Sequence, residues 1–405
     1  MKILYFLGIE LYYIAIFLAQ FFNSKAKKWI IGRKLLWNQI PTINFDEKEV
    51  LWFHCASLGE FDQAIPLIQK IKEYKPESFL LLTFFSPSGF EHYTKRKISV
   101  DLALYLPLDT PKNAKKWCAI FKPSMTFFVK YEFWFFQIQE AKKYGKVYSI
   151  CSLFRENQIY FKWYGKYLQK QLHLIHHFFV QNEFSKRLLN KVGIHQVSVV
   201  GDMRYDRVLE FKNKAPKNVV CEEFIKGEKA WIIGSSWAKD EIFLEESIKK
   251  IGLEKKIIIA AHDISEKHLL SIEQRFENTC IRYSNWNNNS SASILLIDCI
   301  GILNSLYQYA DVAYVGGGFT GKLHNILEPA VYGMGILIGP KFSRFPEAEE
   351  LKQIGVVFPL NNKVEIEEKF NFILQNKQKI AEKVALFLES QKGAAKKIIQ
   401  EIGIG

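Results

Sequence analysis

The sequence predicts an α/β protein with two doubly wound domains, each built on a parallel sheet. Short apolar runs alternate with amphipathic stretches over most of the chain, as in βαβ units. The 405 residues also exceed one typical domain. A polar stretch near the middle, Phe211–Asn218, contains Pro216 and is interpreted as a linker. We therefore expect domains at residues 25–210 and 219–405, which follow an apolar segment at residues 1–24.

This apolar segment is predicted to be a membrane-anchor helix. Ile3–Phe22 is almost continuously apolar and has about the length (~20 residues) that crosses a bilayer as a helix. The basic residues that follow it are unlike a signal peptide and predict that the rest of the chain stays in the cytoplasm; they are Lys25, Lys27, Lys28, Arg33 and Lys34. Because Glu10 is costly inside a bilayer, the alternative is a helix that lies in the membrane interface or packs on the protein.

Apolar runs of strand length continue through both halves of the chain. In the first half they are Val50–His54, Phe79–Phe84, Thr126–Lys130, Val147–Ser152, Phe178–Gln181 and Val197–Val200, with a helix at Ala64–Tyr74. In the second half they are Trp231–Ser235, Ile257–Ala261, Ile294–Asp298, Val312–Gly316 and Gly335–Gly339. Lys363–Ile402 is predicted to form a pair of packing helices. Ligands of open α/β sheets bind outside the carboxyl ends of the strands, so functional residues are expected in the loops that follow them.

Three charged residues of the first half lie in such loops. Glu60 could be a general base for an acceptor hydroxyl, or a first-turn carboxylate that complements a helix dipole. Glu132 lies beside two aromatic residues in Lys130–Trp134, an arrangement that binds a sugar face or stacks in a core. Arg204, in Gly201–Asp206, could stabilise a leaving phosphate, or simply be solvated.

A glycine-rich turn in the second half is the clearest candidate for a ligand site. Gly316–Glu328 reads GGGFTGKLHNILE and precedes a helix that we expect to begin near Asn325. Free backbone amides and a helix dipole at such a turn hold phosphate without a metal, although glycine also serves ordinary turns that need a positive φ. His324, Asn325 and Glu328 could face one ligand from the first turn, and Asn325 could equally be an N-cap.

Composition limits the class of partner. The formal charge of +13 predicts an anionic partner, either phospholipid or a phosphorylated substrate. Lys and Arg are spread without a nucleic-acid motif, so no nucleic acid is expected. The six cysteines stand far apart and no metal-ligand spacing occurs, which predicts reduced thiols and no catalytic metal.

Taken in order, several segments resemble one known family. They are His54–Glu60, Glu132–Trp134, Phe179–Gln181, Gly201–Asp206, Gly234–Glu241, Leu306–Gly318 and His324–Pro329. With them the chain resembles the 3-deoxy-D-manno-octulosonic acid (Kdo) transferases of lipopolysaccharide assembly, inverting glycosyltransferases of the GT-B type. The resemblance implies two Rossmann-like domains that face a central cleft, the first for the acceptor and the second for the donor.

The resemblance also implies a reaction and its residues. Kdo would pass from CMP-Kdo to a lipid A precursor (lipid IVA) at the cytoplasmic face of the anionic inner membrane, without a metal or other cofactor. Glu60 matches the family's base, Glu132 its transition-state motif, and Arg204 stands where the family usually has lysine. The donor contacts implied are Ser235, Ala261, His262, Ile300, Gly301, Ile302, Gly317, Asn325, Ile326, Leu327 and Glu328.

The chain departs from the family at three positions. Ala261 replaces an expected arginine, and Lys322 or Lys239 could supply the missing charge. Lys130 and Ile302 each replace a glutamate. Two alternatives therefore stay open: another GT-B enzyme that uses a UDP-sugar on a lipid-linked acceptor, and a non-catalytic, membrane-attached nucleotide-binding protein. The number of Kdo units transferred and the oligomeric state are not predicted.

Overall fold

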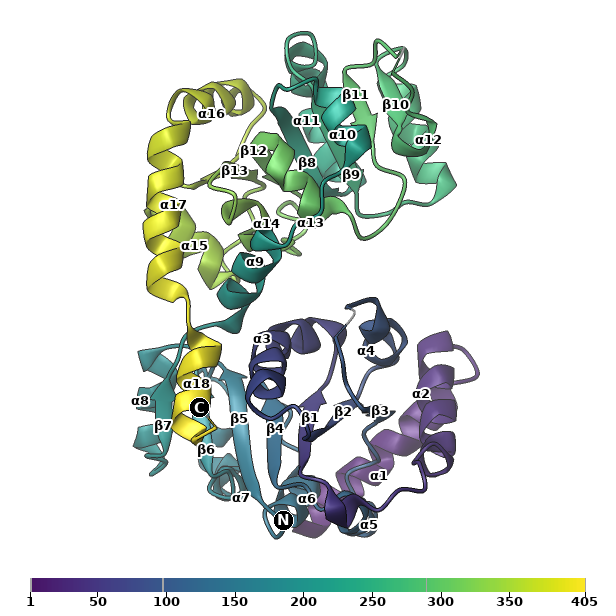
Figure 1. Ribbon diagram of the computed structural model, residues 1–405, viewed down its shortest axis with the longest axis vertical. Coiled ribbons are helices and arrows are strands. Elements are labelled where there is room, and N and C mark those ends of the chain that lie inside the picture. Colours follow the sequence, from purple (N-terminus) through teal and green to yellow (C-terminus); the bar gives the residue numbers. More distant parts are fainter. Residues whose placement is uncertain (1, 97, 289, 405) are drawn as a thin grey trace. The chain divides into compact units, whose positions relative to one another are not determined.

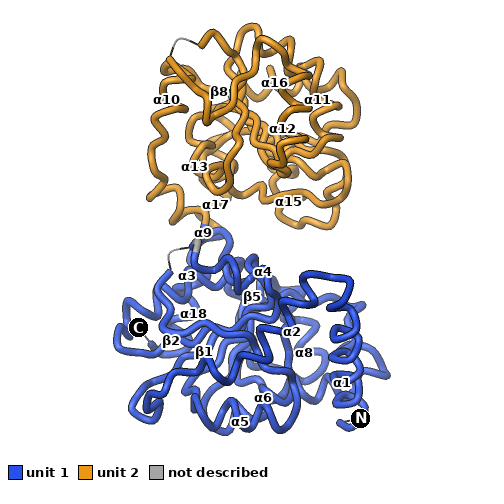
Figure 2. The backbone as a smooth tube through the Cα atoms, turned by 90° about the vertical axis from the view of Figure 1, so that its right-hand side faces the viewer, with its two compact units in different colours: residues 1–207, 391–405 blue, residues 208–390 orange. Residues whose placement is uncertain are grey.

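The computed structural model describes residues 2–96, 98–288 and 290–404, and the chain divides into two compact units (Figure 2). Unit 1 comprises residues 1–207 and 391–405, and unit 2 comprises residues 208–390. Each unit contains a seven-stranded sheet in which every pairing is parallel. The two-domain α/β class expected from the sequence is confirmed.

Unit 1 has the strand order β3-β2-β1-β4-β5-β6-β7. Its strands are β1 (Val50–Cys55), β2 (Phe79–Phe84), β3 (Leu102–Tyr105), β4 (Met125–Val129), β5 (Lys146–Ser152), β6 (His177–Val180) and β7 (Val197–Val199). Its helices are α1 (Lys2–Ala19), α2 (Ser24–Leu35), α3 (Leu58–Tyr74), α4 (Pro87–His92), α5 (Pro111–Phe121), α6 (Phe135–Ala141), α7 (Lys166–Leu172), α8 (Glu183–Lys191) and α18 (Ala394–Ile402), and α9 (Met203–Asn213) crosses the unit boundary.

Unit 2 has the order β10-β11-β9-β8-β12-β13-β14. Its strands are β8 (Ala230–Ser236), β9 (Ile257–Ala261), β10 (Cys280–Arg282), β11 (Ile294–Leu296), β12 (Ala310–Val315), β13 (Gly335–Ile338) and β14 (Val357–Pro359). Its helices are α10 (Val219–Ile225), α11 (Ala238–Ile251), α12 (Glu266–Arg275), α13 (Leu303–Leu306), α14 (Leu327–Ala330), α15 (Pro346–Gln353), α16 (Val364–Gln375) and α17 (Lys377–Gln391).

Both faces of the first sheet are buried, which explains why its strands are continuous apolar runs. Trp52 of β1 enters one hydrophobic core, and its neighbour Phe53 enters the core on the opposite face. A parallel sheet covered by helices on both sides requires apolar residues at every strand position. Figure 1 shows helices on both sides of this sheet.

The structure corrects the predicted boundaries at several points. β3, β10 and β14 were not predicted, because edge strands of three or four residues carry too few apolar positions to stand out. The boundary between the units falls inside α9, after Arg207, rather than in a linker at Phe211–Asn218.

The last helix belongs to unit 1, so assigning the whole C-terminal stretch to the second domain was wrong for α18. Ala395, Ile398 and Ile399 are buried in the same core as Ile65 of α3. The carboxylate of Asp206 caps α18, because Oδ1 accepts from the Gly393 amide (2.6 Å) and Oδ2 from the Ala395 amide (2.9 Å). Figure 1 shows this helix in yellow against the first sheet.

Replacing Ile398 by alanine tests the role of α18. The side chain is fully buried, so Ile398→Ala should lower the free energy of unfolding of unit 1 by about 2–5 kcal/mol. Chemical denaturation followed by tryptophan fluorescence measures the change. Lys396→Ala, at an exposed position of the same helix, is the control and should change stability by less than about 0.5 kcal/mol. Equal effects of the two variants would contradict the packing of α18 in this core.

Candidate active site at the carboxyl ends of the strands

The candidate residues of each unit lie where the strand order of its sheet reverses. In the first sheet this switch point lies between β1 and β4, and in the second it lies between β8 and β12. Loops that leave two such strands run in opposite directions and open a crevice that binds ligands. Glu60 follows β1 and Glu132 follows β4. Ser235 is the penultimate residue of β8, and Gly316 follows β12.

Glu60 is a half-buried carboxylate in the first turn of α3. Its Oε2 accepts a hydrogen bond from the Ala56 amide (2.5 Å). Burial, followed by the negative charge of Glu132, raises the pKa of Glu60 to about 7, while the positive charge of Lys130 acts in the opposite direction. A carboxylate with this pKa can accept a proton near neutral pH, as a general base must. Gly59 lies in the first turn of α3 and has no positive φ.

Glu132 is held by a ring nitrogen of Trp134. Trp134 Nε1 donates to Glu132 Oε2 (3.0 Å) and lies 3.1 Å from Nε2 of the buried His54. Burial lowers the pKa of His54, which keeps the imidazole neutral at pH 7. The expectation that the aromatic residues beside Glu132 could stack in a core holds for Phe133, which is buried.

The partners of His54 define its tautomer. Because Nε2 accepts from Trp134, the proton lies on Nδ1, which donates to Thr83 Oγ1 (2.9 Å). Thr83 Oγ1 also accepts from Trp52 Nε1 (2.8 Å). The sequence analysis gave no role to His54, although a histidine inside an apolar strand is a signal for a buried polar network.

The two cations of this site differ in their surroundings. Arg204 is paired with its neighbour Asp202, with 2.7 Å between Nε and Oδ2. Lys130 has φ 60°, and its charge lowers the pKa of Glu60. Lys130 and Glu132 therefore act on the pKa of Glu60 in opposite directions, one as a cation and the other as a carboxylate.

In unit 2, the buried Asp240 ties two loops together. Its Oδ1 accepts from the Tyr314 hydroxyl (2.6 Å), and its Oδ2 accepts from the amides of Trp237 (2.9 Å) and Gly317 (3.1 Å). Asp240 therefore fixes the loop after β8 to the loop after β12. The sequence did not indicate this role, since Tyr314 and Gly317 are distant from Asp240 in the chain.

The glycine-rich turn is used for close backbone packing. A Cβ on Gly316 would lie 2.2 Å from the Ser235 carbonyl oxygen, and a Cβ on Gly317, at φ 91°, would lie 2.1 Å from the Lys322 carbonyl oxygen. The Gly316 amide donates to Gly234 O (2.9 Å), and the Gly317 amide donates to Asp240. These two amides are thus unavailable to a phosphate, and the expectation of a glycine nest is wrong for them.

Three aromatic rings stack at the carboxyl edge of the second sheet. The His262 ring lies 4.2 Å from the Trp237 ring and 4.6 Å from the His324 ring, centroid to centroid. Trp237 Nε1 donates to His324 Nε2 (3.2 Å), and burial lowers the pKa of His324. Two of these rings come just after strands. Ser235 (φ 52°), near the end of β8, lies two residues before Trp237, and Ala261, the last residue of β9, directly precedes His262.

The helix expected to begin near Asn325 begins two residues later, at Leu327. α14 begins at Leu327 and has four residues, so its dipole is small. Asn325 Oδ1 accepts from the Leu327 amide (3.1 Å), and Asn325 Nδ2 donates to Glu328 Oε1 (3.1 Å). The side chains of Ile326 and Leu327 are buried in the core.

The remaining predicted donor contacts lie after β11. Ile300 is exposed, Gly301 has φ 99°, and Ile302 precedes the first turn of α13. A Cβ on Gly301 would meet no atom within 4 Å. Residues 300–302 therefore carry no charged side chain, whereas Asp298 of the same loop accepts a hydrogen bond from the Ser284 amide.

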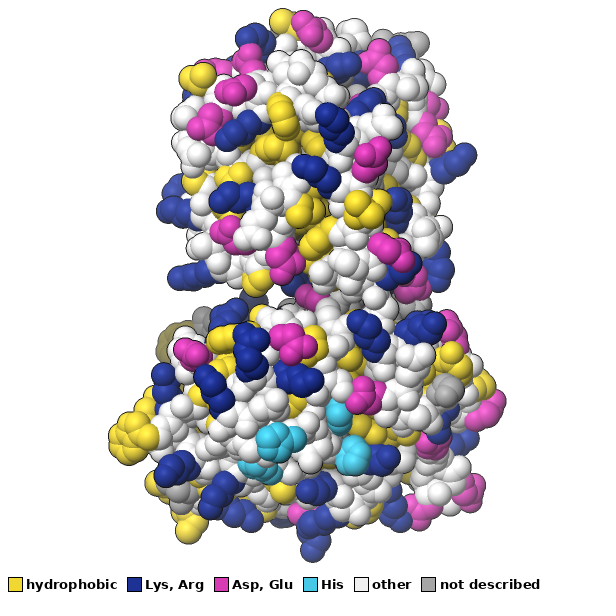
Figure 3. All heavy atoms as spheres, turned by 90° about the vertical axis from the view of Figure 1, so that its left-hand side faces the viewer, with side chains coloured by type: hydrophobic (Ala, Val, Ile, Leu, Met, Phe, Trp, Pro, Cys, Tyr) yellow, Lys and Arg dark blue, Asp and Glu magenta, His cyan; other side chains and the backbone are white. Residues whose placement is uncertain are grey.

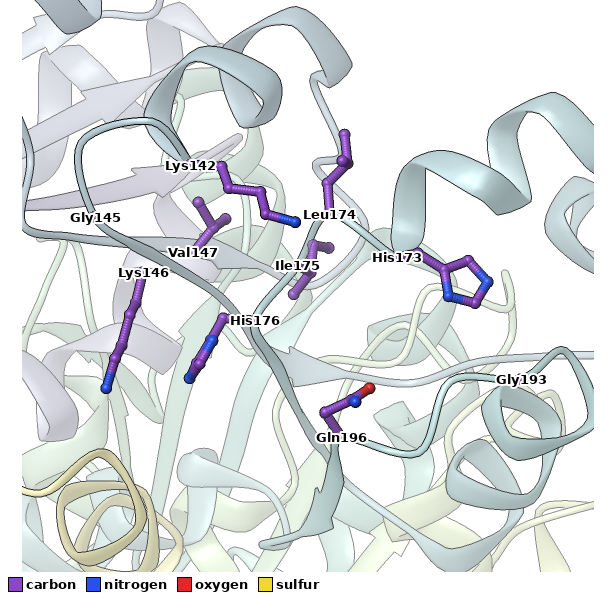
Figure 4. Close-up of a pocket in the computed structure, with 10 residues that line it drawn as sticks. All are labelled: Lys142, Gly145, Lys146, Val147, His173, Leu174, Ile175, His176, Gly193 and Gln196. Carbon is purple, nitrogen blue, oxygen red and sulfur yellow. The ribbon is translucent and has the colours of Figure 1, made fainter.

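A separate pocket of about 490 Å³ lies at the opposite, amino ends of β5, β6 and β7 (Figure 4). Its lining residues include Lys142 and His173, which follow the last residues of α6 and α7. Cations are favoured there because a helix dipole is negative at its carboxyl end. Figure 3 shows histidine side chains and side chains of Lys or Arg on one face of unit 1. Among the described residues, no group of three His, Cys, Asp or Glu could hold a metal ion.

Replacing the charges around Glu60 should move its pKa in opposite directions. Glu132→Gln removes a like charge and should lower the Glu60 pKa below about 7, whereas Lys130→Gln should raise it. Nuclear magnetic resonance titration of the labelled Glu60 carboxyl carbon measures the shift. Glu73→Gln, at an exposed position of the same helix, is the control and should leave the pKa unchanged. Shifts of the same sign in both test variants would contradict this electrostatic arrangement.

Residues 32–207 match the family described as 3-deoxy-D-manno-octulosonic-acid transferase (kdotransferase). The chain is 28% identical to the Aquifex aeolicus 3-deoxy-D-manno-octulosonic acid transferase over 81% of this chain and 86% of that protein. It is 26% identical to the Chlamydophila psittaci transferase of the same name, over 80% of this chain and 77% of that protein. A bifunctional glycosyltransferase/methyltransferase from Fusobacterium nucleatum is 24% identical, over 87% of this chain and 56% of that protein.

Solved structures show the same fold. The UDP-GlcNAc 2-epimerase from Neisseria meningitidis has a TM-score of 0.62 at 17% identity, over 87% of this chain and 98% of that one. A putative UDP-N-acetylglucosamine 2-epimerase from Listeria monocytogenes has a TM-score of 0.61 at 14% identity, over 88% of this chain and 96% of that one. The GT-B-type arrangement of two parallel sheets is thereby confirmed. The match over residues 32–207 and the similarity to these relatives support the assignment of this chain to the Kdo transferases, which are glycosyltransferases.

Proposed function

We propose that this chain transfers Kdo from CMP-Kdo to a lipid A precursor, lipid IVA. The observation that supports this most is Glu60, a half-buried carboxylate at the switch point of unit 1 with a pKa raised to about 7. It lies within the residues that match the Kdo transferase family.

In the proposed reaction, Glu60 removes the proton of the acceptor hydroxyl. The hydroxyl oxygen forms a bond to the anomeric carbon of Kdo, and the bond from that carbon to the CMP phosphate breaks with its electrons going to CMP. Direct displacement inverts the anomeric configuration. Positive charge develops on the sugar in such a transition state, and the carboxylate of Glu132 can stabilise it. Arg204, oriented by Asp202, is proposed to stabilise the negative charge on the leaving phosphate.

Unit 2 is proposed to hold the donor at the loops after β8, β9, β11 and β12. The proposed contacts are the ring stack of Trp237, His262 and His324, together with Asn325 and Glu328. Neither Lys239 nor Lys322 forms an ion pair with a described residue, so both are available to replace the arginine absent at Ala261. A CMP donor carries only one phosphate, and we propose that side-chain charges and backbone dipoles suffice to bind it without a metal or other cofactor.

Transfer of Kdo tests the proposal directly. The full-length protein in detergent should release CMP from CMP-Kdo in the presence of lipid IVA, equally with and without EDTA. Glu60→Gln should lower kcat about 10²- to 10⁴-fold, and Glu73→Gln should not change it. Because the base must be deprotonated, activity should rise with pH and level off above about pH 7. Release of UDP from UDP-sugars instead of CMP would favour another GT-B enzyme, and no release from either donor would favour a binding protein.

Helix α1 is proposed to lie in the membrane interface along unit 1 rather than to cross the bilayer. It is the one helix among the described residues that is long and apolar enough to cross a membrane. Its Tyr5 hydroxyl donates to Asp109 Oδ2 (2.6 Å), Ile9 is buried, and the Tyr12 ring lies 6.1 Å from the Phe85 ring. Residues 5, 9 and 12 share one helix face, so two turns of α1 lie along the protein.

The opposite face of α1 is apolar and exposed, and basic residues follow it. Its exposed residues are Ile3, Leu4, Leu7, Leu11, Ile14 and Leu18, and the turn after α1 adds the exposed Phe21 and Phe22, of which Phe22 is 94% exposed. Lys25, Lys27 and Lys34 of α2 lie next in the chain and are available to anionic headgroups. This arrangement fits the anionic inner membrane at its cytoplasmic side, with α1 buried at the level of the headgroups.

Two charges on the exposed face should release the protein from vesicles. Burial of one leucine contributes about 1.5–3 kcal/mol, so Leu4→Glu/Leu11→Glu should weaken binding to phosphatidylglycerol vesicles at least about tenfold. Co-sedimentation measures this, with Leu253→Glu at an exposed position of unit 2 as the control. Alkaline carbonate should extract the wild-type protein from membranes. Resistance to that extraction would indicate a helix that crosses the bilayer.

A further inference from the structure

Arg33 of α2 is half-buried, and its guanidinium is enclosed by aromatic rings. Its guanidinium carbon lies 3.6 Å from the centroid of Trp29, 4.8 Å from Phe85 and 5.3 Å from Tyr105. Burial lowers the pKa of Arg33 to about 9, so the group is still charged at neutral pH. Among the described residues, no carboxylate pairs with it, and its buried Nε and Nη1 have no hydrogen-bond partner.

Burying a charge without an ion pair costs free energy, so contacts of other kinds must stabilise the guanidinium of Arg33. Stacking on aromatic faces offsets part of this cost. The remaining nitrogen, Nη2, donates to the backbone carbonyl of Phe85 (3.1 Å). The guanidinium thus contacts both the ring and the backbone of Phe85, in the loop after β2.

Phe85 links this cation to the proposed catalytic carboxylates. The Phe85 ring stacks on the Trp134 ring, with centroids 4.8 Å apart and planes 18° apart. Trp134 Nε1 in turn donates to Glu132 Oε2 (3.0 Å). Two aromatic side chains therefore separate Arg33 from Glu132.

The same cluster includes the helix proposed to lie in the membrane interface. Tyr12 of α1 stacks on Phe85 and lies edge-on to Trp29, with ring centroids 6.1 and 6.2 Å apart. Gly32 approaches so closely that a Cβ there would lie 2.2 Å from the Tyr105 ring, which fixes α2 against the sheet. The path from α1 and α2 to Glu132 is therefore continuous packing.

We propose that Arg33 is a positioning residue for Glu132, acting through Phe85 and Trp134, and that it joins the orientation of this carboxylate to helices α1 and α2. The catalytic part of the inference rests on the proposed function. Arg33 itself touches neither Glu132 nor Glu60 in any contact described above. Its role is to keep the Phe85 ring against Trp134.

The test compares Arg33→Met with Lys116→Met in the full-length protein. Lys116 makes a cation–π contact of the same kind in unit 1, 4.0 Å from the Trp37 centroid, but has no link to Glu132. Because a displacement of about 1 Å at a catalytic group can lower the rate about 10²-fold, Arg33→Met should lower kcat about 10- to 100-fold without raising the donor KM. Lys116→Met should leave kcat unchanged. Lower thermal stability of Arg33→Met with an unchanged kcat would overturn the proposal.

A double-mutant cycle tests the path through Phe85. If Arg33 acts through that ring, Phe85→Leu alone should lower kcat similarly, and the double variant Arg33→Met/Phe85→Leu should be no slower than Phe85→Leu. If the double variant lost kcat by the product of the two single losses, Arg33 would act by another route. That result would overturn the proposal.

A spectroscopic readout separates this inference from the proposed function. The indole N–H resonance of Trp134, identified by its loss in Trp134→Phe, should shift in Arg33→Met and not in Lys116→Met, whatever the enzyme transfers. An unshifted resonance in Arg33→Met would overturn the positioning role. A shifted resonance in a protein inactive with CMP-Kdo would support the positioning role and contradict only the proposed function.

Discussion

The parallel pairing of β1 with β4 is the constraint on which the candidate site of unit 1 depends. Leu51 pairs with Met125, and His54 pairs with Phe128, so the two strands end at the same edge of the sheet. The chain leaves β1 toward α3 and leaves β4 toward Glu132. Without this pairing, two carboxylates far apart in the sequence would have no reason to lie close together. The pairing itself depends on the two apolar cores that cover the sheet.

The proximity of the two carboxylates has an electrostatic effect. Burial and the charge of Glu132 both disfavour the ionised form of Glu60, while the Ala56 amide and Lys130 favour it. These opposing effects leave the pKa near neutrality. Glu132 is itself oriented by Trp134, which also donates to a neutral His54. The orientation of this carboxylate thus depends on an aromatic side chain that carries no charge.

Part of this organisation was predictable from the sequence. The strands before Glu60 and Glu132 are apolar runs, and their confirmed positions followed from that pattern. The membership of α18 in unit 1 was not predictable, because helical periodicity shows which face is buried but not which core receives it. The glycine-rich turn was ambiguous for a similar reason. Only the approach of Gly316 to Ser235, distant in the chain, shows that these glycines serve backbone packing.

The hydrogen-bond partners of buried polar residues could also not be predicted from the sequence. Asp240 reads as a first-turn helix carboxylate, and only the structure shows that it receives the Tyr314 hydroxyl and the Gly317 amide. Arg33 reads as one member of a basic cluster, whereas the structure encloses it between aromatic rings. Such residues are identified by long-range contacts that a local pattern does not contain.

The return of α18 to unit 1 means that the polypeptide passes between the units twice, inside α9 and again at the end of α17. No single continuous fragment therefore contains all of the first unit and nothing of the second. A fragment ending at Arg207 would expose the apolar surface of α3 that Ile398 and Ile399 cover, and would be prone to aggregate. Separate production of the first unit would require a short artificial loop from Arg207 to Gln391 in place of the excised second unit.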